Sequence, residues 1–476
     1  MSPRRIALIA GSALAVGSAA AAVWPGPRPS VRMLFTGDIL LARQVLAEMR
    51  RTGESPFDSV RPLFASAAWV AGNFEGAIGS PRSCVARDTL MCFSSLDTAP
   101  ALLARAGFKA VFVENNHAGD LGANGRQRTR DVMRAAGLLA VDFDHSPRFT
   151  RLGGLTVATV AVSLVRGADG QAQSIPSVAL AQKLRLARAL ADVVVASIHW
   201  GTELQDWPSE AQRTAAEWLV DHGADLVVGH HPHVVQASEC VHGRPVFYSL
   251  GNFVFDQRYP QTKAGLIADC TLRGRRLRCG ALTTHALPGS AAPAISDGPQ
   301  ARALAGCVVN LPAPLTVSGY VLRPEPWSAS ASDDGTVIEG LRRGAPRWAT
   351  RRVDLVSLQA GLTDTGGAPL VLALERHSSP MDGEDAVRPH VYAVTDRGFV
   401  ARWRGTALAW PLVDAVMDDR GRLCALHRGD SFLRPEPQTP SRRTMVYRWN
   451  GFGFSAGGDS AEADTCRATM RGTGGP

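Results

Sequence analysis

The sequence predicts an α/β domain followed by an all-β domain, and three observations support this prediction. Short apolar runs alternate with helical stretches from Val31 to about residue 285, a pattern typical of α/β layers. Residues 286–312 are rich in Pro, Gly and Ala and indicate a boundary. Beyond them, residues 350–455 contain short strand-like runs separated by turn residues, as all-β domains do. We therefore expect domains at 31–312 and 313–476.

In the first domain, seven apolar runs have the length and composition of buried strands. Two of the intervening segments have helical spacing. Residues 128–137 end on a glycine, and residues 209–223 open with Ser209 as the expected N-cap. The predicted strands are 31–35, 69–74, 109–114, 155–162, 192–198, 225–229 and 245–250.

The second domain contains a repeated four-residue motif. RWRG at Arg402–Gly405 and RWNG at Arg448–Gly451 lie 46 residues apart, which is close to the blade period of a propeller. The domain has room for three or four blades only, so we predict partial propeller-like repeats. The residues from about Ala456 are expected to be frayed.

Length and composition limit the possible classes of protein. A chain of 476 residues is too long for one ordinary core. A hydrophobic content of 45% and a charged content of 20% are typical of globular proteins. The formal charge of +8 suits an anionic partner, and a solvated surface explains it equally well. Basic runs interleaved with aromatic residues are missing, so a nucleic-acid partner is not expected.

The first 30 residues have the layout of a targeting segment. MSPRR precedes an uncharged stretch rich in Ala and Gly from Ile6 to Trp24, and the break WPGPRPS follows. This is the pattern of a secretory signal, and the stretch is also just long enough for one membrane anchor. Either way, we expect an exported protein, in the periplasm or on the extracytoplasmic face of the membrane. The membrane is a partner if the segment is not cleaved.

Eight cysteines agree with an oxidising compartment. Cys84 and Cys92 bracket a short loop, and Cys270 and Cys279 flank a hairpin-like segment, so both pairs are predicted disulfides. A cysteine zinc site is not expected because CxxC does not occur. The sequence leaves the pairing of the other four open: Cys240, Cys307, Cys424 and Cys466.

Polar residues of metal-binding type follow five of the predicted strands. Each has an ordinary explanation when taken alone: Asp38 could cap a helix, and His199 could be a hydrogen-bonded core histidine. Five such positions at equivalent strand ends favour convergence on one metal site. The residues are Asp38, then Asn73 and Glu75, then Asn116, His117 and Asp120, then His199, and finally His230, His231 and His233.

Mixed nitrogen and oxygen ligands suit Mn, Fe or Zn better than Ca, and enough ligands are present for two ions. A carboxylate bridges the two ions in such sites, and a water between them becomes a nucleophile near neutral pH. Glu75 is the predicted bridge. His117 lies beside a predicted ligand, Asn116, and is placed to protonate a leaving group.

Six ordered motifs within about residues 31–285 resemble the CapA family of bacterial capsule and poly-γ-glutamate synthesis proteins. That family is similar in turn to the calcineurin-like metallophosphoesterases. The resemblance implies a metallophosphoesterase-like four-layer α/β/β/α sandwich with a dinuclear metal centre. The motifs are GD at Gly37–Asp38, NFE at Asn73–Glu75, NNHAGDLGANG at Asn115–Gly125, HWGTE at His199–Glu203, GADLVVGHHPHVVQ at Gly223–Gln236 and YSLGNFVFDQ at Tyr248–Gln257.

Carried over by position, the resemblance implies six metal ligands: Asp38, Glu75, Asn116, His199, His231 and His233. His117 takes the position of the catalytic histidine. Leu40 stands where the phosphoesterase Asp-x-His motif has histidine, and Glu75 stands where those enzymes have aspartate. The predicted substrate contacts are Asn73, Asp120, Glu203, His230 and Asn252.

Two functions of different classes follow from these residues. The first is a metal-dependent hydrolase of the cell envelope, acting on a phosphoester or on a bond in an anionic cell-surface polymer. The second is a non-catalytic assembly or export factor that holds the polymer in the same groove through its metal. Bound metal without turnover would favour the second.

Overall fold

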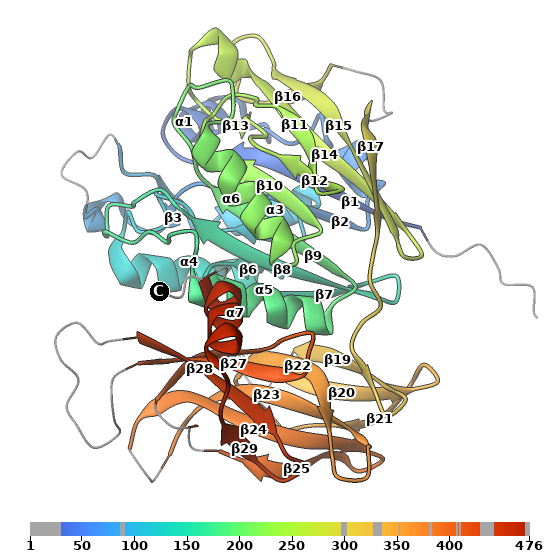
Figure 1. The fold of residues 1–476 in the computed structure, drawn as a ribbon. Coiled ribbons are helices and arrows are strands. Elements are labelled where there is room, and N and C mark those ends of the chain that lie inside the picture. The colour runs from blue at the N-terminus through green and yellow to red at the C-terminus, as the bar shows by residue number, and fades with distance from the viewer. Residues whose placement is uncertain are drawn as a thin grey trace, which may run out of the picture.

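The computed structural model describes residues 30–85, 91–296, 302–326, 336–351, 353–379, 383–405, 408, 411–428 and 442–471 (Figure 1). The predicted targeting segment lies outside the described residues, apart from Ser30. Among the described helices, none combines the length and the apolar character needed to cross a membrane.

A nine-stranded sheet forms the first layer of the α/β region. Its strands β1, β2, β5 and β6 are parallel, so their carboxyl ends meet at one edge. The sheet order is β16 (Pro293–Ile295), β15 (Arg276–Ala286), β14 (Ala264–Arg273), β1 (Ser30–Ile39), β2 (Trp69–Phe74), β5 (Ala110–Phe112) and β6 (Leu139–Val141), with β13 (Asn252–Val254) on β1 and β17 (Arg302–Asn310) on β15.

A six-stranded sheet forms the second layer. Its strands β8, β9, β10 and β12 are parallel, and they coincide with predicted apolar runs. The order is β11 (Ser238–Val241), β12 (Arg244–Phe247), β10 (Leu226–His230), β9 (Val193–His199), β8 (Leu155–Ser163) and β7 (Arg148–Leu152).

Helices connect the parallel strands. The two predicted helices are confirmed, and Ser209 caps α6 through a reciprocal pair of bonds with Gln212. The helices are α1 (Arg43–Thr52), α2 (Arg61–Ala65), α3 (Ala99–Ala106), α4 (Gly122–Ala135), α5 (Val178–Leu190) and α6 (Glu210–Asp221); short elements are β3 (Ala77–Ile78), β4 (Ser94–Ser95) and the 3₁₀ turns η1 (Pro81–Ser83) and η3 (Pro260–Lys263).

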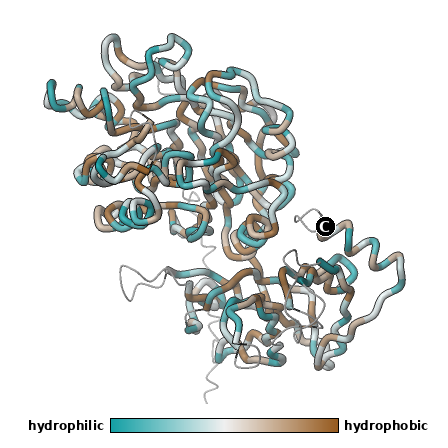
Figure 2. Tube along the Cα trace, turned by 90° about the vertical axis from the view of Figure 1, so that its left-hand side faces the viewer, coloured by the Kyte–Doolittle hydropathy of each residue, from teal (hydrophilic) through white to brown (hydrophobic). Residues whose placement is uncertain are grey.

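Three apolar clusters hold this region together, and apolar residues run through its interior in Figure 2. One cluster joins Phe35 and Trp69 of the first sheet to Val195 of the second. Another packs the first sheet against α1 to α4, and a third packs the second sheet against α5 and α6. Burial of continuous apolar runs on both faces is characteristic of parallel sheets. The predicted α/β domain is therefore confirmed.

The C-terminal region contains three four-stranded antiparallel sheets. In each sheet, spatial order follows chain order. The strands are β18 (Thr316–Val317), β19 (Tyr320–Pro326), β20 (Thr336–Arg342) and β21 (Ala345–Ala349); β22 (Leu355–Thr363), β23 (Pro369–Ser378), β24 (Asp385–Thr395) and β25 (Gly398–Arg404); β26 (Leu412–Met417), β27 (Arg422–Arg428), β28 (Arg442–Trp449) and β29 (Phe454–Ala456).

Two expectations for this region, a frayed end and a purely β composition, are wrong. The segment expected to be frayed forms α7 (Ser460–Arg471), where Cys466 and Met470 are buried, so the region is not purely β. The repeated Arg-Trp motif does not mark equivalent positions, because Trp403 lies in the last strand of its sheet and Trp449 in the third. The two indoles instead contact each other edge to face, with ring centroids 6.5 Å apart.

The segment rich in Pro, Gly and Ala also differs from a simple linker. It contributes β16 and β17 to the edge of the first sheet, where both pair with β15. A disulfide between Cys240 and Cys307 ties β11 of the second sheet to β17. The first sheet therefore extends to Asn310, and β18 begins at Thr316.

Both predicted disulfides are confirmed. Cys84 pairs with Cys92, and Cys270 pairs with Cys279 directly across β14 and β15. Of the four cysteines left open by the sequence, Cys240 pairs with Cys307, and Cys424 pairs with Cys466.

The C-terminal sheets pack against α5 of the α/β region. The Gln182 amide donates to the Val413 carbonyl at 2.9 Å. The Arg185 guanidinium donates to both carboxylate oxygens of the fully buried Asp414, each at 2.7 Å. An apolar cluster that includes Leu186 and Leu190 continues the contact. This interface is therefore built from buried, hydrogen-bonded and apolar groups.

Candidate functional site

The predicted site residues come together where the carboxyl ends of strands from both sheets meet. In the first sheet, Asp38 lies in register with Asn73 on one side and with Asn252 on the other. In the second sheet, His199 and His230 are register partners at the ends of β9 and β10. Parallel pairing places these side chains at one edge without further adjustment.

Local backbone geometry brings the two edges close. A Cβ atom on Gly37 would lie 1.9 Å from the carbonyl oxygen of Gly251, so only glycine allows this approach. His231 and His233 adopt positive φ values of 97° and 59°. Such backbone is unfavourable for a residue with a side chain, and it is held here by the surrounding structure. The turn places the His233 imidazole between Asp38 and Glu75 and the His231 imidazole beside His199.

Two buried carboxylates, Asp38 and Glu75, form the base of the site. The Asn73 amide donates to Asp38 at 2.8 Å and to Glu75 at 3.2 Å. The Asn115 amide in turn donates to the Asn73 side-chain oxygen at 3.0 Å and to the Phe74 carbonyl at 2.9 Å. This relay fixes which end of the Asn73 amide faces the carboxylates.

His233 lies between these carboxylates. Its Nδ1 is 3.1 Å from Asp38, and its Nε2 is 3.4 Å from Glu75. Burial alone would lower the pKa of His233, but the negative charges of Glu75 and Asp38 raise it to about 9. Burial likewise favours a neutral Asp38, yet the nearby imidazoles of His230 and His233 hold its pKa well below the ordinary value. The pocket thus stabilises positive charge at this place.

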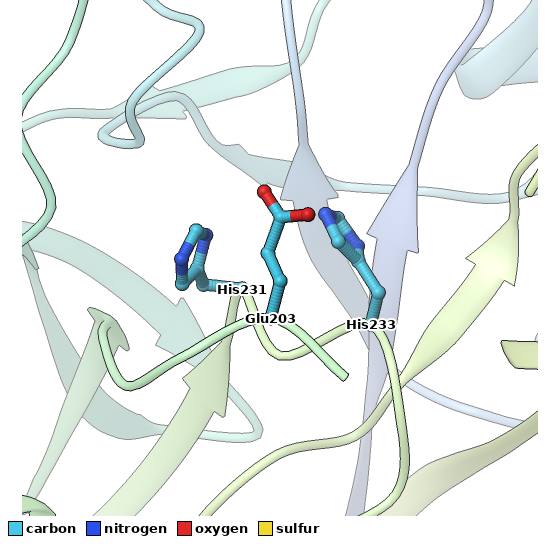
Figure 3. A group of neighbouring side chains, drawn as sticks. All are labelled: Glu203, His231 and His233. Atoms are coloured by element: carbon cyan, nitrogen blue, oxygen red, sulfur yellow. The ribbon is translucent and has the colours of Figure 1, made fainter. Parts of the chain in front are cut away.

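Glu203, His231 and His233 form a second group, shown in Figure 3, in which the Glu203 side chain stands between the two imidazoles. Their ligand atoms all lie within 4.8 Å of one another, and the same holds for Asp38, Glu75 and His233. His233 belongs to both groups. Burial, together with the nearby His233, lowers the pKa of His231 to about 4, so its ring is neutral at pH 7 and able to bind a metal.

His199 and Asn116 form the far side of the site. The His199 Nε2 is 2.7 Å from the Asn116 side-chain oxygen, and the His199 ring lies 4.8 Å from that of His231 between centroids. Burial holds the pKa of His199 well below its ordinary value, which keeps the imidazole neutral.

The donor set fits divalent metal ions. Several buried polar atoms at this point have no hydrogen-bond partner among the described residues, which is costly unless a ligand is bound. The nitrogen and oxygen donors are those preferred by Mn, Fe and Zn. The unsatisfied atoms are Glu75 Oε1, His199 Nδ1, His231 Nδ1, and both ring nitrogens of His230.

His117 is held beside this cluster by its own contacts. Its Nδ1 is 2.8 Å from the Asp120 carboxylate, which also accepts a 2.7 Å bond from the Phe93 amide. The Phe93 ring stacks on the imidazole with centroids 3.6 Å apart. The guanidinium carbon of Arg43 lies over the Phe93 ring, 4.4 Å from its centroid. Asp120 as an acceptor fixes the proton on Nδ1 and leaves Nε2 for other chemistry.

The five predicted substrate contacts lie in or beside the cluster. Asn73 and Asp120 are buried and bond to Asp38 and His117 respectively. His230 is buried with its Nδ1 3.4 Å from Asp38. The Asn252 side-chain oxygen lies 3.0 Å from His233, whereas Glu203 is exposed. Contact of these residues with substrate stays a prediction.

Three contributors were not predicted from the sequence. Asn115 orients Asn73, Phe93 stacks on His117, and Arg43 pairs with Asp256 and covers Phe93. Leu40 packs in an apolar cluster that includes Phe93. The doubled asparagine of the NNH motif could have pointed to Asn115. The residues next to Phe93 in the sequence do not indicate its contact with His117.

A groove with a volume of about 610 Å³ adjoins the cluster through Phe255, whose ring lies 4.6 Å from that of His233 between centroids. Arg51, Arg258 and Lys263 line it. Two acidic residues also line it: Glu48 accepts a hydrogen bond from the Ala291 amide, and Asp256 pairs with Arg43. The groove therefore presents net positive charge next to the candidate metal site.

Comparison with known proteins agrees with these motifs. Residues 32–257 match the family model described as bacterial capsule synthesis protein PGA_cap. The chain is 32% identical over 255 residues to the PGA biosynthesis protein CapA of Bacillus subtilis (strain 168), covering 50% of this chain and 67% of the relative. It is 31% identical over 288 residues to the capsule biosynthesis protein CapA of Bacillus anthracis, covering 56% and 70%.

Among solved structures, TT1561 of Thermus thermophilus matches with a TM-score of 0.31 and 14% identity, covering 53% of this chain and 98% of that one. The assignment depends instead on the sequence relatives and on the ordered motifs, which lie within the matched residues. The chain belongs to the bacterial capsule synthesis protein family PGA_cap.

Proposed function

We propose that this protein acts in the synthesis of capsule or poly-γ-glutamate as a metal-dependent hydrolase of a phosphoester or of a bond in the anionic polymer. The observation that carries the proposal is the pair of ligand groups that share His233. Two adjoining groups of this kind suit two ions, as in two-metal hydrolases. The relatives named for PGA and capsule biosynthesis support the polymer as the biological context.

The residues that would hold the ions are Asp38, Glu75, Asn116, His199, His231 and His233, and Glu203 is placed to join them. Mn, Fe or Zn fits this donor set. When bound, two such ions supply Lewis-acid activation of water and neutralise negative charge that develops on the reacting group. Asn73 holds Asp38 and Glu75 in the orientation that this requires.

His117 supplies the proton in the proposed reaction. Because Asp120 accepts from Nδ1, it holds the ring so that a proton carried on Nε2 can pass to the leaving group, which leaves a neutral imidazole. Phe93 covers one face of the ring and excludes water from it. His117 is 7% exposed, so bulk water has little access to the ring.

The adjoining groove supports an anionic polymer as substrate. Arg51, Arg258 and Lys263 offer positive charge along a channel that begins at Phe255. Carboxylates of an extended chain would be attracted to these cations while one bond of the chain lies at the metal cluster.

The arrangement of helices and sheets supports a metallophosphoesterase-like sandwich, with helices outside two facing sheets. We propose the domain division at residue 312, with partial propeller-like repeats in the second domain. Export is supported by four disulfides among the described residues, since such bonds persist in oxidising compartments.

The proposal is tested with the purified full chain and its His117→Ala and His231→Ala variants. Metal content is measured, and turnover of a phosphodiester and of poly-γ-glutamate is assayed with added Mn²⁺. We expect His231→Ala to lose metal and activity, and His117→Ala to lose about 10²–10⁴-fold in kcat while keeping its metal. The matched control is His242→Ala, an exposed histidine outside the cluster.

Absence of turnover in metal-loaded wild type, together with polymer binding that depends on His231, would favour the assembly or export factor. Leu40 at the position of a phosphoesterase histidine supports keeping this second function under test, because its side chain is buried among apolar groups and offers no ligand.

A further inference from the structure

A second histidine cluster lies in the C-terminal region, on the sheet formed by β22 to β25. His377 on β23 and His390 on β24 direct their Nε2 atoms at each other, 3.3 Å apart. Their rings are inclined by 45°. These strands are separated in sequence from the strand-end cluster, and no motif of the first domain includes them.

The partners of the two Nδ1 atoms determine where the protons lie. His377 Nδ1 is 2.9 Å from the Ser378 carbonyl oxygen, which can only accept, so this nitrogen carries the proton. His390 Nδ1 is 2.9 Å from the Tyr392 hydroxyl and 3.3 Å from the Glu375 carboxylate. The Tyr392 hydroxyl donates to Glu375 at 2.8 Å, so its oxygen accepts from His390.

Both Nε2 atoms are therefore acceptors in the neutral rings, and two lone pairs face each other at 3.3 Å. Such a contact is repulsive unless a cation lies between the nitrogens. Two imidazoles on a tetrahedral zinc ion, with Zn–N bonds of about 2.0–2.1 Å, hold their nitrogens about 3.3 Å apart. The observed separation has this value.

We propose that His377 and His390 bind a divalent transition-metal ion such as Zn²⁺, at a site independent of the strand-end cluster. The surroundings of His390 resemble the carboxylate–histidine–metal arrangement in which the second ring nitrogen is held by an acidic side chain. The Glu375 carboxylate lies 3.3 Å from His390 Nδ1 and accepts a hydrogen bond from the Tyr392 hydroxyl, so it orients the His390 ring.

The remaining coordination positions face a cavity with a volume of about 640 Å³. Arg376 and Arg404 line it together with both histidines. Two protein ligands leave room for water or for an anionic group, which the guanidinium groups would attract. A carboxylate or phosphate oxygen is the class of ligand that completes this site.

The experiment is a Co²⁺ titration of the metal-free full chain, followed by visible absorption, with the metal content measured separately. Wild type is compared with His377→Gln, His390→Gln and the exposed control His242→Gln. We expect both site variants to bind one ion fewer per chain than wild type and to lose the absorption of that ion. His242→Gln should match wild type. Equal metal content in wild type and both site variants would overturn the proposal and indicate that the histidines share a proton.

Two further measurements keep the result independent of folding and of the proposed hydrolase. Glu375→Gln retains both ligands and should weaken Co²⁺ binding at this site about 10–100-fold, as loss of such an orienting partner does elsewhere. The His231→Ala variant, which keeps His377, should still bind the ion that His377→Gln loses. Loss of that ion in His231→Ala alone would assign it to the strand-end cluster and refute the second site.

Discussion

At the scale of single residues, the site depends on buried polar groups that restrain one another. Asn73 donates to both Asp38 and Glu75, and Asn115 holds Asn73. Asp120 plays the same part for His117. The low dielectric of the interior strengthens such networks and makes each unpaired member costly. Substituting an orienting residue should therefore reduce function without removing a ligand.

Asp120→Asn is the sharpest test of this view. The amide can present N–H to His117 Nδ1 and so favour the other tautomer, which puts the proton in the wrong place. If the hydrolase proposal holds, kcat should fall about 10–100-fold, while metal content stays at the wild-type level. Metal content and kcat measured on one preparation check this. An unchanged kcat would exclude a proton role for His117.

Asp142 shows how a residue away from the site contributes to stability. It accepts bonds from His145 at 2.9 Å and from Arg130 at 2.8 Å. Burial alone would raise the pKa of Asp142, but these partners hold it below the ordinary value. A carboxyl with a lower pKa in the folded state stabilises that state above its unfolded pKa. This stability is lost as the pH falls through the folded pKa.

Asp142→Asn should accordingly lower the free energy of unfolding by about 1–3 kcal/mol at pH 7. The deficit should shrink as the pH drops below the ordinary aspartate range, because the wild-type carboxyl is then protonated as well. Urea unfolding between pH 7 and pH 3 measures this. Asp58→Asn, at an exposed aspartate, serves as the control. A deficit that is the same at both pH values would contradict the charge-based explanation.

At the scale of elements, α7 is held to the β sheets by a covalent bond and by packing. The Cys424–Cys466 disulfide closes a separation of 42 residues. Buried Cys466 and Met470 pack against Leu426 and Val446 of β27 and β28. Position at the chain end suggested fraying of the residues from about Ala456. The partners that dock the helix, Cys424 and the apolar residues of β27 and β28, are distant in the chain.

Replacing both Cys424 and Cys466 by Ala should lower the free energy of unfolding by about 2–4 kcal/mol, because the cross-link no longer restrains the unfolded chain. Limited proteolysis should then cleave first near α7. A Cys84→Ala, Cys92→Ala double variant, which removes a shorter loop, should lose less stability. Equal losses in the two variants would contradict the dependence on loop length.

At the scale of the whole molecule, charge distribution matters more than net charge. The chain carries a formal +8, and Arg51, Arg258 and Lys263 line the groove beside the candidate metal site. They come from α1 and from the segment between β13 and β14, which are distant in sequence. The first sheet brings these segments together because β13 and β14 both pair with β1.

Arg258→Glu and Lys263→Glu should each weaken binding of poly-γ-glutamate about 2–5-fold at low ionic strength, with a smaller effect at high salt. Fluorescence anisotropy with labelled polymer at two salt concentrations measures this. Arg276→Glu, at the exposed first residue of β15, carries the same change of charge outside the groove. Equal weakening by all three substitutions would show that overall charge, and not the groove, attracts the polymer.

The sequence alone was sufficient for the α/β region and for most of its candidate site. The apolar runs predict parallel strands, and the carboxyl ends of parallel strands meet at one edge of a sheet. Asp38, Glu75, His199 and His231 could therefore be assigned to one place before any coordinates. Two disulfides were also accessible, because Cys84–Cys92 and Cys270–Cys279 join residues close in sequence.

Contacts between residues distant in sequence were decided by the tertiary structure. The Phe93 ring on His117, the Cys240–Cys307 and Cys424–Cys466 pairs, and the groove cations depend on how separate segments pack. The facing histidines His377 and His390 depend on the register of β23 with β24. Local patterns specify elements because periodicity is a property of one segment. Partners across the fold follow only from the packing of the whole chain.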